Sequence, residues 1–273
     1  MDIQAGATVA ALQAGLPLEP LENRILLCHA LGLTRVGLIT QSDRVVTGDE
    51  AAALRALVER RLHGEPIAYI VGRREFFGLD FRVTSAVLIP RPDTELLVEL
   101  ALERLAPQAR VLDMGTGSGA IAVALAHTRR DAQVTALDVS PAALDVARQN
   151  AVANGARVRL VQSDWFSAIQ GERFDMLVSN PPYIASGDAH LAQGDLRFEP
   201  RGALTDHADG LSALRTIIKG APAHLEPGGW LLMEHGYDQA QQVRNLLTDH
   251  GYSEVASWRD LGGIERVTGG RAA

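Results

Sequence analysis

One run of the sequence constrains the fold more than any other: a glycine-rich loop set between an apolar strand and an apolar helix. Val111–Met114 has the pattern of a buried strand, residues 115–119 form the loop, and Ala120–Ala126 has the pattern of a buried helix. We expect further strands at Gln133–Leu137, Val158–Val161, Met176–Val178, Trp230–Met233, Glu254–Trp258 and Glu265–Thr268. Alternating strands and helices are typical of a parallel sheet covered on both faces. The pattern therefore predicts an α/β, doubly wound domain.

The sequence before this domain changes character twice. Residues 1–72 carry apolar residues at helical spacing and predict a small helical domain. Gly64 and Pro66 mark the end of its last clear helix, because Pro cannot continue a helical hydrogen-bond ladder. Residues 73–90 predict a β-hairpin, which we interpret as a linker. The large domain then covers residues 91–273.

The composition restricts the class of partner. The chain has 26 Lys and Arg against 33 Asp and Glu, a formal net charge of -7. Proteins that hold nucleic acid by phosphate contacts usually present a basic face, so we expect no nucleic-acid partner. Cys28 is the single cysteine, and no Cys/His cluster has zinc spacing, so we expect no disulfide and no metal. Without an apolar membrane run or a signal peptide, we expect a cytoplasmic monomer.

The glycine-rich loop predicts a cofactor site. Ligands of parallel sheets bind at the carboxyl ends of the strands, where glycines let the backbone approach the ligand and turn sharply. Asp138 ends the second strand, and an acid there can accept both hydroxyls of a ribose. Gly115, Gly117 and Ala120 also fit the dinucleotide fingerprint. A nicotinamide dehydrogenase and a glycine-rich turn without a ligand therefore remain alternatives at this point.

Two features favour S-adenosyl-L-methionine over a dinucleotide. Asp113 precedes the loop, where a carboxylate suits the cofactor's ammonium group but would repel a pyrophosphate. Asp164 and Trp165 follow the third strand, where an acid can hydrogen-bond an adenine amino group and a ring can pack on the base. Taken alone, Trp165 would be interpreted as a core aromatic, but the series as a whole favours the cofactor.

The most specific motif ends the fourth strand and consists of Asn180, Pro181, Pro182 and Tyr183. The side-chain oxygen of Asn180 can accept one hydrogen of a planar NH2 group, and the Pro181 carbonyl can accept the other. Accepting both raises the electron density on nitrogen while its lone pair faces the methyl group. Tyr183 can pack against the planar target. The motif indicates methyl transfer to such a nitrogen, with an Asn-capped Pro-Pro turn as the structural alternative.

Over nearly its whole length the chain resembles the bacterial peptide chain release factor N5-glutamine methyltransferases. The segments that carry the resemblance are Gly64–Tyr69, Arg74–Phe76, Leu88–Glu95, Asp113–Gly119, Asn180–Tyr183, Arg197–Pro200 and Glu265–Thr268. Asn-Pro-Pro-Tyr is shared with adenine N6 methyltransferases and specifies planar NH2 chemistry only. Leu88–Glu95 together with Arg197–Pro200 is more particular to the family.

The resemblance implies a substrate-docking helical domain, followed in the sequence by a Rossmann-like, seven-stranded class I S-adenosylmethionine methyltransferase domain. It implies methylation of the glutamine in the Gly-Gly-Gln motif of class 1 release factors. Asn180 would contact cofactor and substrate, and Pro181, Pro182 and Tyr183 would hold the glutamine. The cofactor-binding residues would be Gly115, Thr116, Gly117, Ser118, Gly119, Asp138, Trp165 and Asn180. Arg91 and Glu95 would support the pocket, and Arg197 and Glu199 would order a loop over the site. For each of the four, an ordinary ion pair is an equal alternative.

Other classes of function explain the motifs less completely. An adenine N6 nucleic-acid methyltransferase is the second hypothesis, but it would need a basic channel and a target-recognition insert that the sequence does not show. A dehydrogenase leaves residues 180–183 without a role. A non-catalytic binding module has no reason to combine an intact cofactor loop with the Asn-Pro-Pro-Tyr motif.

Overall fold

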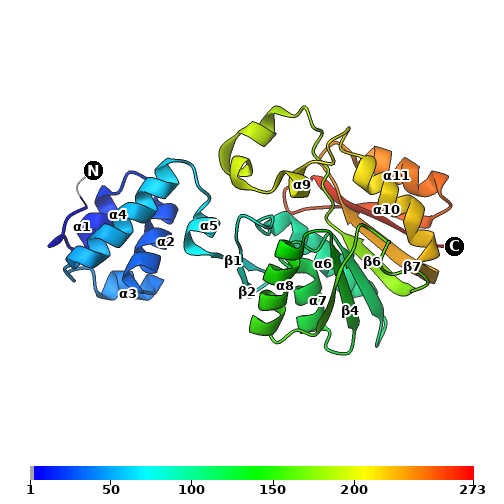
Figure 1. The fold of residues 1–273 in the computed structure, drawn as a ribbon, viewed down its shortest axis with the longest axis horizontal. Coiled ribbons are helices and arrows are strands. Elements are labelled where there is room, and N and C mark those ends of the chain that lie inside the picture. The colour runs from blue at the N-terminus through cyan, green and yellow to red at the C-terminus, as the bar shows by residue number, and fades with distance from the viewer. Residues whose placement is uncertain (1–2) are drawn as a thin grey trace. The chain divides into compact units, whose positions relative to one another are not determined.

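The computed structural model describes residues 3–273, and the chain divides into two compact units after Gly72 (Figure 1). Within the described residues the first unit is helical. Its helices are α1 (Val9–Gly15), α2 (Pro20–Leu31), α3 (Arg35–Thr40), α4 (Gly48–Leu62) and α5 (Ile67–Val71).

Helix α4 begins with a reciprocal cap, in which the Thr47 hydroxyl accepts from the backbone of Glu50 and the Glu50 carboxylate accepts from the backbone of Thr47. Leu26 of α2 and Leu54 and Val58 of α4 are fully buried in one shared apolar cluster. The first unit therefore has a core of its own.

The hairpin that follows belongs to the second unit. Strands β1 (Arg73–Phe76) and β2 (Leu79–Arg82) pair antiparallel, and their Phe76 and Phe81 rings meet edge to face in the core of that unit. The Asn150 side chain binds both the backbone N–H and the carbonyl of Arg82, at 2.7 and 3.0 Å. The hairpin expected as a linker is thus packed onto the larger unit, because its aromatic residues are buried there.

The centre of the second unit is a seven-stranded sheet in the order β5-β4-β3-β6-β7-β9-β8, with β9 antiparallel to both of its neighbours. This confirms the predicted Rossmann-like sheet. Its strands are β3 (Arg110–Met114), β4 (Gln133–Asp138), β5 (Val158–Gln162), β6 (Phe174–Ser179), β7 (Leu225–Glu234), β8 (Ser253–Arg259) and β9 (Glu265–Arg271). The helices around it are η1 (Pro92–Thr94), α6 (Glu95–Arg104), α7 (Ala120–Thr128), α8 (Pro141–Ala153), α10 (Ser212–Gly220), η4 (Ala221–Ala223) and α11 (Ala240–Asp249).

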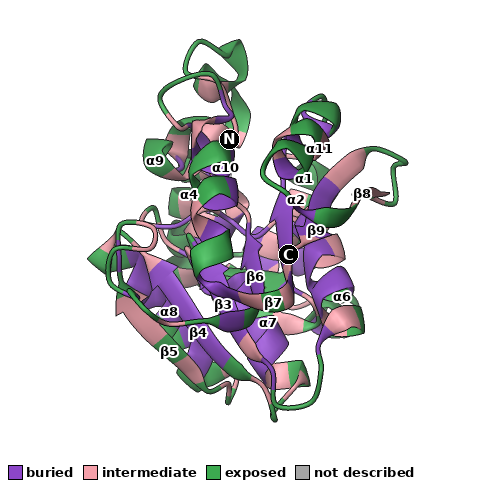
Figure 2. Ribbon diagram, turned by 90° about the vertical axis from the view of Figure 1, so that its right-hand side faces the viewer, coloured by how far each residue is buried: buried purple, intermediate pink, exposed green. Residues whose placement is uncertain are grey.

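Successive residues of each central strand serve opposite faces of the sheet. Val111 packs in the cluster that contains α6 and α7, whereas Leu112 and Met114 pack in the cluster that contains α10 and α11. Both faces of the central strands are therefore buried, as their colours in Figure 2 show, and Val111, Leu112 and Met114 of β3 are apolar for this reason.

A long segment joins β6 to α10 at the carboxyl ends of the strands. It carries only short helices, η2 (Ala189–Ala192), η3 (Gly194–Phe198) and α9 (Arg201–Leu204). One isolated bridge between Ile184 and Thr205 closes it into a loop. No helix in residues 3–273 is long and apolar enough to span a membrane.

Candidate active site

Three strand ends bring the predicted site residues together. In the sheet β3 lies between β4 and β6, and Met114 is in register with both Leu137 and Ser179. The Ser179 hydroxyl donates to the Met114 carbonyl at 2.7 Å and ties two of these ends together. The segments that follow β3, β4 and β6 therefore leave the same edge of the sheet side by side.

A cavity of about 280 Å³ opens at this edge. It is lined by six of the predicted site residues, Gly115, Gly117, Asp138, Trp165, Asn180 and Pro182. Segments far apart in the sequence, Ala86–Leu88 and Pro200–Ala203, complete its wall. The cavity thus joins the predicted cofactor residues to the first part of the Asn-Pro-Pro-Tyr motif.

Positive φ angles shape the loop that borders the cavity. Gly115 and Gly117 have φ angles of 71° and 55°, and a Cβ on either would meet no atom within 4 Å. Gly119 differs, because a Cβ there would lie 3.1 Å from Cβ of Ala147 in α8. The first two glycines therefore leave open space for a ligand, while the third allows two helices to approach each other.

Two other predicted loop residues support the loop from the side that faces the protein interior. Thr116 and Ser118 are buried and do not line the cavity. The Thr116 hydroxyl donates to Asp113 Oδ2 at 2.6 Å, and the Ser118 carbonyl accepts from Asn150 Nδ2 at 2.8 Å. Sequence reasoning grouped these residues with the glycines, but the structure turns their side chains to the protein interior.

Two carboxylates lie near the carboxyl ends of the strands, and of the two only Asp138 lines the cavity. Asp138 accepts from the backbone N–H groups of Gly117 and Ser140, each at 2.9 Å, which ties the glycine loop to the end of β4. Burial raises the pKa of Asp138. Asp113 is completely buried, which raises its pKa to about 7, and its Oδ1 has no hydrogen-bond partner among residues 3–273. A cationic ligand group would satisfy that oxygen, as the cofactor's ammonium would.

Trp165 lies at the cavity with a strained backbone. Its φ angle is 46°, a region that bulky residues rarely adopt. The Ser163 hydroxyl donates to the Trp165 carbonyl at 2.6 Å and accepts from Ala168 N at 3.1 Å, which holds the turn. Such strain persists where surrounding contacts enforce it and is concentrated at functional sites.

The Asn-Pro-Pro-Tyr motif is held at both ends. Asn180 Nδ2 donates to Thr94 Oγ1 at 3.1 Å, and the Tyr183 hydroxyl donates to Glu234 Oε1 at 3.1 Å. Burial, with the nearby charge of Glu234, raises the pKa of Tyr183, so its hydroxyl stays protonated. Pro181 is buried, and neither it nor Tyr183 lines the cavity.

The four charged residues without a predicted role are now placed. Arg91 Nη2 donates to both oxygens of Glu199, at 2.7 and 2.9 Å, and the Glu199 side chain is fully buried. Glu95 accepts from the backbone N–H of Phe77, whereas Arg197 donates to the Gly194 carbonyl. The Arg91–Glu199 pair therefore holds the segment before α9 close to the cavity wall at Pro200.

Sequence reasoning missed Thr94 and Glu234 as parts of this site. Thr94 stood within the distinctive stretch Leu88–Glu95 but carried no signal of its own. Glu234 follows the apolar residues of β7, and an acid that ends a buried strand was the available signal.

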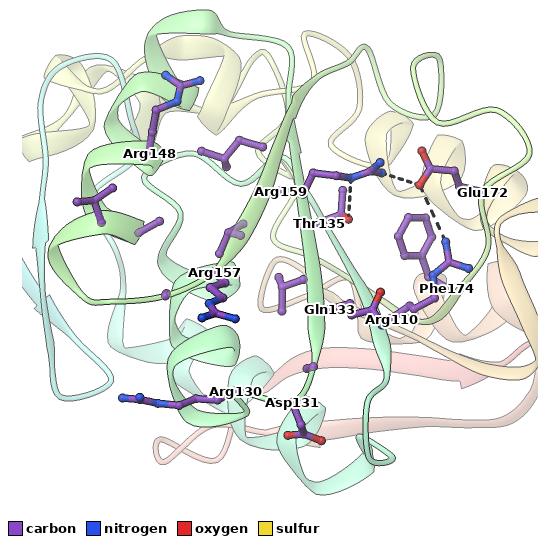
Figure 3. Close-up of a pocket in the computed structure, with 17 residues that line it drawn as sticks. Arg110, Arg130, Asp131, Gln133, Thr135, Arg148, Arg157, Arg159, Glu172 and Phe174 are labelled. Carbon is purple, nitrogen blue, oxygen red and sulfur yellow. Dashed lines mark hydrogen bonds and ion pairs between the residues drawn. The ribbon is translucent and has the colours of Figure 1, made fainter.

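A larger groove of about 750 Å³ lies at the other end of the strands (Figure 3). It includes Arg110 and Gln133, the first residues of β3 and β4, together with exposed arginines. Glu172 binds Arg159 at 2.6 Å and lies 4.0 Å from Arg110. The groove contains none of the predicted site residues and is separate from the cavity at the carboxyl edge.

Family models match both units. Residues 4–72 match the PrmC N-terminal domain, and residues 92–196 match the methyltransferase small domain. Solved structures share the fold at low identity. The methyltransferase of Pyrococcus furiosus has a TM-score of 0.56 at 22% identity, covering 78% of this chain and 96% of that one. The Mtq2–Trm112 complex of E. cuniculi, described as responsible for methylation of eRF1, has a TM-score of 0.50 at 20% identity, covering 69% and 99%.

Curated relatives match nearly the full chain. The release factor glutamine methyltransferase of Burkholderia pseudomallei is 56% identical over 97% of this chain and 96% of its own length. Its namesakes in Bordetella pertussis and Vibrio cholerae are 57% and 46% identical, over 94% and 97% of this chain and 95% and 94% of their own lengths. With such identity across both units, this chain belongs to the release factor glutamine methyltransferases, a family that uses S-adenosyl-L-methionine.

Proposed function

We propose that this protein transfers the methyl group of S-adenosyl-L-methionine to the N5 side-chain nitrogen of the glutamine in the Gly-Gly-Gln motif of class 1 release factors. The observation that carries the proposal is the position of Asn180, which borders the cofactor cavity and opens the Asn-Pro-Pro-Tyr motif. We infer that the reaction takes place in the cytoplasm, where translation ends.

The residues around the cavity suit the chemistry of the cofactor. The two open glycines would let the cofactor lie against the backbone, and the free lone pairs of Asp138 would accept its ribose hydroxyls. Trp165 would flank the adenine. Asp113, buried with an unsatisfied oxygen, would attract the ammonium group at close range. Thr116, Ser118 and Gly119 would contribute by holding the loop.

The chemistry needs positioning more than a base. S-adenosyl-L-methionine supplies a methyl group on an activated sulfonium. Asn180 Oδ1 and the Pro181 carbonyl would accept the two amide hydrogens of the glutamine, which orients the nitrogen and enriches it in electrons. Pro182 and Tyr183 would hold the planar amide in place. The proton can leave after the transfer, so no residue has to remove it beforehand.

The helical unit would dock the release factor. Half of the exposed large apolar side chains in residues 3–273 lie in this unit: Leu21, Val36, Ile39, Val45 and Leu62. Val36 and Ile39 stand three residues apart on α3, so they share one face, with 67% and 76% exposure. Exposed apolar side chains gathered on a small unit favour a protein partner.

The docking role can be tested on that face. Val36→Ser together with Ile39→Ser should lower kcat/KM for an intact release factor by about tenfold, on the order of the apolar area lost. Turnover of a short Gly-Gly-Gln peptide should not change. Val152→Ser, at an equally exposed position on α8, is the matched control. Equal losses on factor and peptide would count against docking.

We further propose that the enzyme acts as a monomer and needs no nucleic acid. The acidic net charge of -7 supports this reading and gives no support to adenine methylation. The decisive experiment offers labelled S-adenosyl-L-methionine with an intact release factor, its Gln→Ala variant at Gly-Gly-Gln, and a DNA duplex. We expect label on the intact factor only. Label on the Gln→Ala variant would reject the target residue, and label on DNA would reject the proposal.

A further inference from the structure

We propose that Thr94 and Glu234 are positioning residues that determine which end of the Asn180 side-chain amide faces the substrate. The inference rests on the proposed function, since only a reaction on an NH2 group requires the oxygen end. It concerns the hydrogen-bond chain from Asn180 through Thr94 to Glu234.

An asparagine amide has two ends of similar size and opposite character. The oxygen accepts hydrogen bonds and the NH2 group donates them. If Asn180 presented its NH2 group to a glutamine amide, two donors would meet and the nitrogen would not be held. The site must therefore select one of two orientations that differ little in shape.

Thr94 selects between them through the direction of one proton. Its side chain is buried, and its Oγ1 accepts from Asn180 Nδ2 at 3.1 Å. A hydroxyl has one proton to donate. If that proton is committed to another acceptor, Oγ1 can only accept from Asn180, which leaves Asn180 Oδ1 to face the substrate.

Glu234 is the acceptor that commits the proton. It is 1% exposed at the end of β7, and the nearby Thr94 hydroxyl favours its charged form. An ionised carboxylate accepts only, so the order of donation is Asn180 to Thr94 to Glu234. Oε2 is buried without a hydrogen-bond partner in residues 3–273, and it is the acceptor to which we assign the Thr94 proton.

Glu234 also binds the other end of the motif. The Tyr183 hydroxyl donates to Oε1 at 3.1 Å. One buried acid thus holds both Asn180, through Thr94, and Tyr183. Around it, Arg266 favours the charged form and Asp93 opposes it, while burial raises the pKa of Glu234 to about 7.

A purely structural role would not require a charge. Burying a carboxylate costs free energy that a glutamine of the same shape would avoid. With glutamine, however, the side-chain NH2 group can donate to Thr94 Oγ1 and free the Thr94 proton for Asn180 Oδ1. The orientation of Asn180 would then no longer be determined, and a share of the molecules would present the wrong end.

The test compares Glu234→Gln, Thr94→Val and Thr94→Ser at pH 8.5, where Glu234 is ionised. Glu234→Gln and Thr94→Val should each lower kcat about tenfold or more through misplacement of Asn180, with the KM for S-adenosyl-L-methionine unchanged. Thr94→Ser keeps the hydroxyl and should restore kcat to within about threefold of wild type. The kcat of the double variant Glu234→Gln/Thr94→Val should fall no further than that of either single variant, because both substitutions break the same series of hydrogen bonds.

Controls separate this role from folding and from the choice of substrate. Glu226→Gln, at the other end of β7, is the matched variant and should behave as wild type. The Asn180 side-chain N–H resonance bonded to Thr94 should be protected from exchange in wild type and Thr94→Ser, and unprotected in Glu234→Gln. This readout needs no methyl acceptor, so it stands even if the release factor assignment fails. Full kcat in Thr94→Val, equal losses in Thr94→Val and Thr94→Ser, or unchanged protection in Glu234→Gln would overturn the proposal.

Discussion

Charged residues at the two ends of the central strands, called here the carboxyl edge and the amino edge of the sheet, differ in how deeply they are buried. At the carboxyl edge, Asp113 and Glu234 are completely buried, and each has an oxygen without a partner among the described residues. At the amino edge, Arg159 and Glu172 pair in the open, with side chains 51% and 31% exposed. The groove at the amino edge is the larger, at about 750 against 280 Å³. Buried charges, rather than volume, therefore point to the proposed reaction site.

The largest effect should come from Asn180, the proposed acceptor for the glutamine amide. Asn180→Ala removes the acceptor that we propose for an amide hydrogen of the glutamine, and turnover should fall by about 100- to 1,000-fold. Cofactor affinity, measured by calorimetry, should change only a few-fold. Asn245→Ala, on the exposed face of α11, is the control. Turnover within a few-fold of wild type would show that Asn180 does not act on the substrate amide.

A smaller effect is expected from Asp138, the residue proposed to bind the cofactor ribose. Asp138→Ala removes a charged acceptor and releases the Gly117 backbone, so the Kd for S-adenosyl-L-methionine should rise by about 10- to 100-fold. Asp145→Ala, on the exposed side of α8, should leave the Kd unchanged. An unaltered Kd in Asp138→Ala would show that the carboxylate only shapes the loop.

The raised pKa of Asp113, about 7, predicts a pH-dependent affinity. Because we propose that the ionised form attracts the cofactor's ammonium, we expect the affinity to be about tenfold weaker at pH 6 than at pH 8. Asp113→Asn should lose this dependence. A flat profile in wild type would mean that Asp113 does not meet the ammonium.

The same group affects stability in the cofactor-free protein. Its pKa is about 7 in the folded state and 3.8 in the unfolded reference, so the folded state binds more protons between these values. The free energy of unfolding should therefore fall as pH rises from about 4 to about 7. Asp113→Asn should flatten this part of the melting-temperature profile.

The smallest effect should come from the amino edge. Arg159→Ala breaks an exposed ion pair and should change the free energy of unfolding by less than about 1 kcal/mol. Methyl transfer should be unaffected. A large loss of turnover would break the contrast between the two edges and give the basic groove a part in the reaction.

Local patterns predicted much of the fold. The strands were found because the inner parts of β3, β6 and β7 are buried on both faces and so carry short runs of adjacent apolar residues. Leu21 of α2 is apolar and yet 53% exposed, because helical spacing alone does not say which turn of a helix meets a neighbour. The hairpin expected to link the units joined the larger one because Phe76 and Phe81 found their core there.

Local patterns likewise predicted one part of the candidate site but not the rest. The glycine loop, Asp138, Trp165 and Asn180 follow strand ends, and the topology of parallel sheets brings such residues to one edge, so the sequence by itself determined their neighbourhood. Only the tertiary structure decided that Thr116 and Ser118 turn inward, that Thr94 binds Asn180 and that Glu234 binds Tyr183. The physical reason is that burial and hydrogen-bond direction depend on partners distant in the chain, which no local pattern encodes.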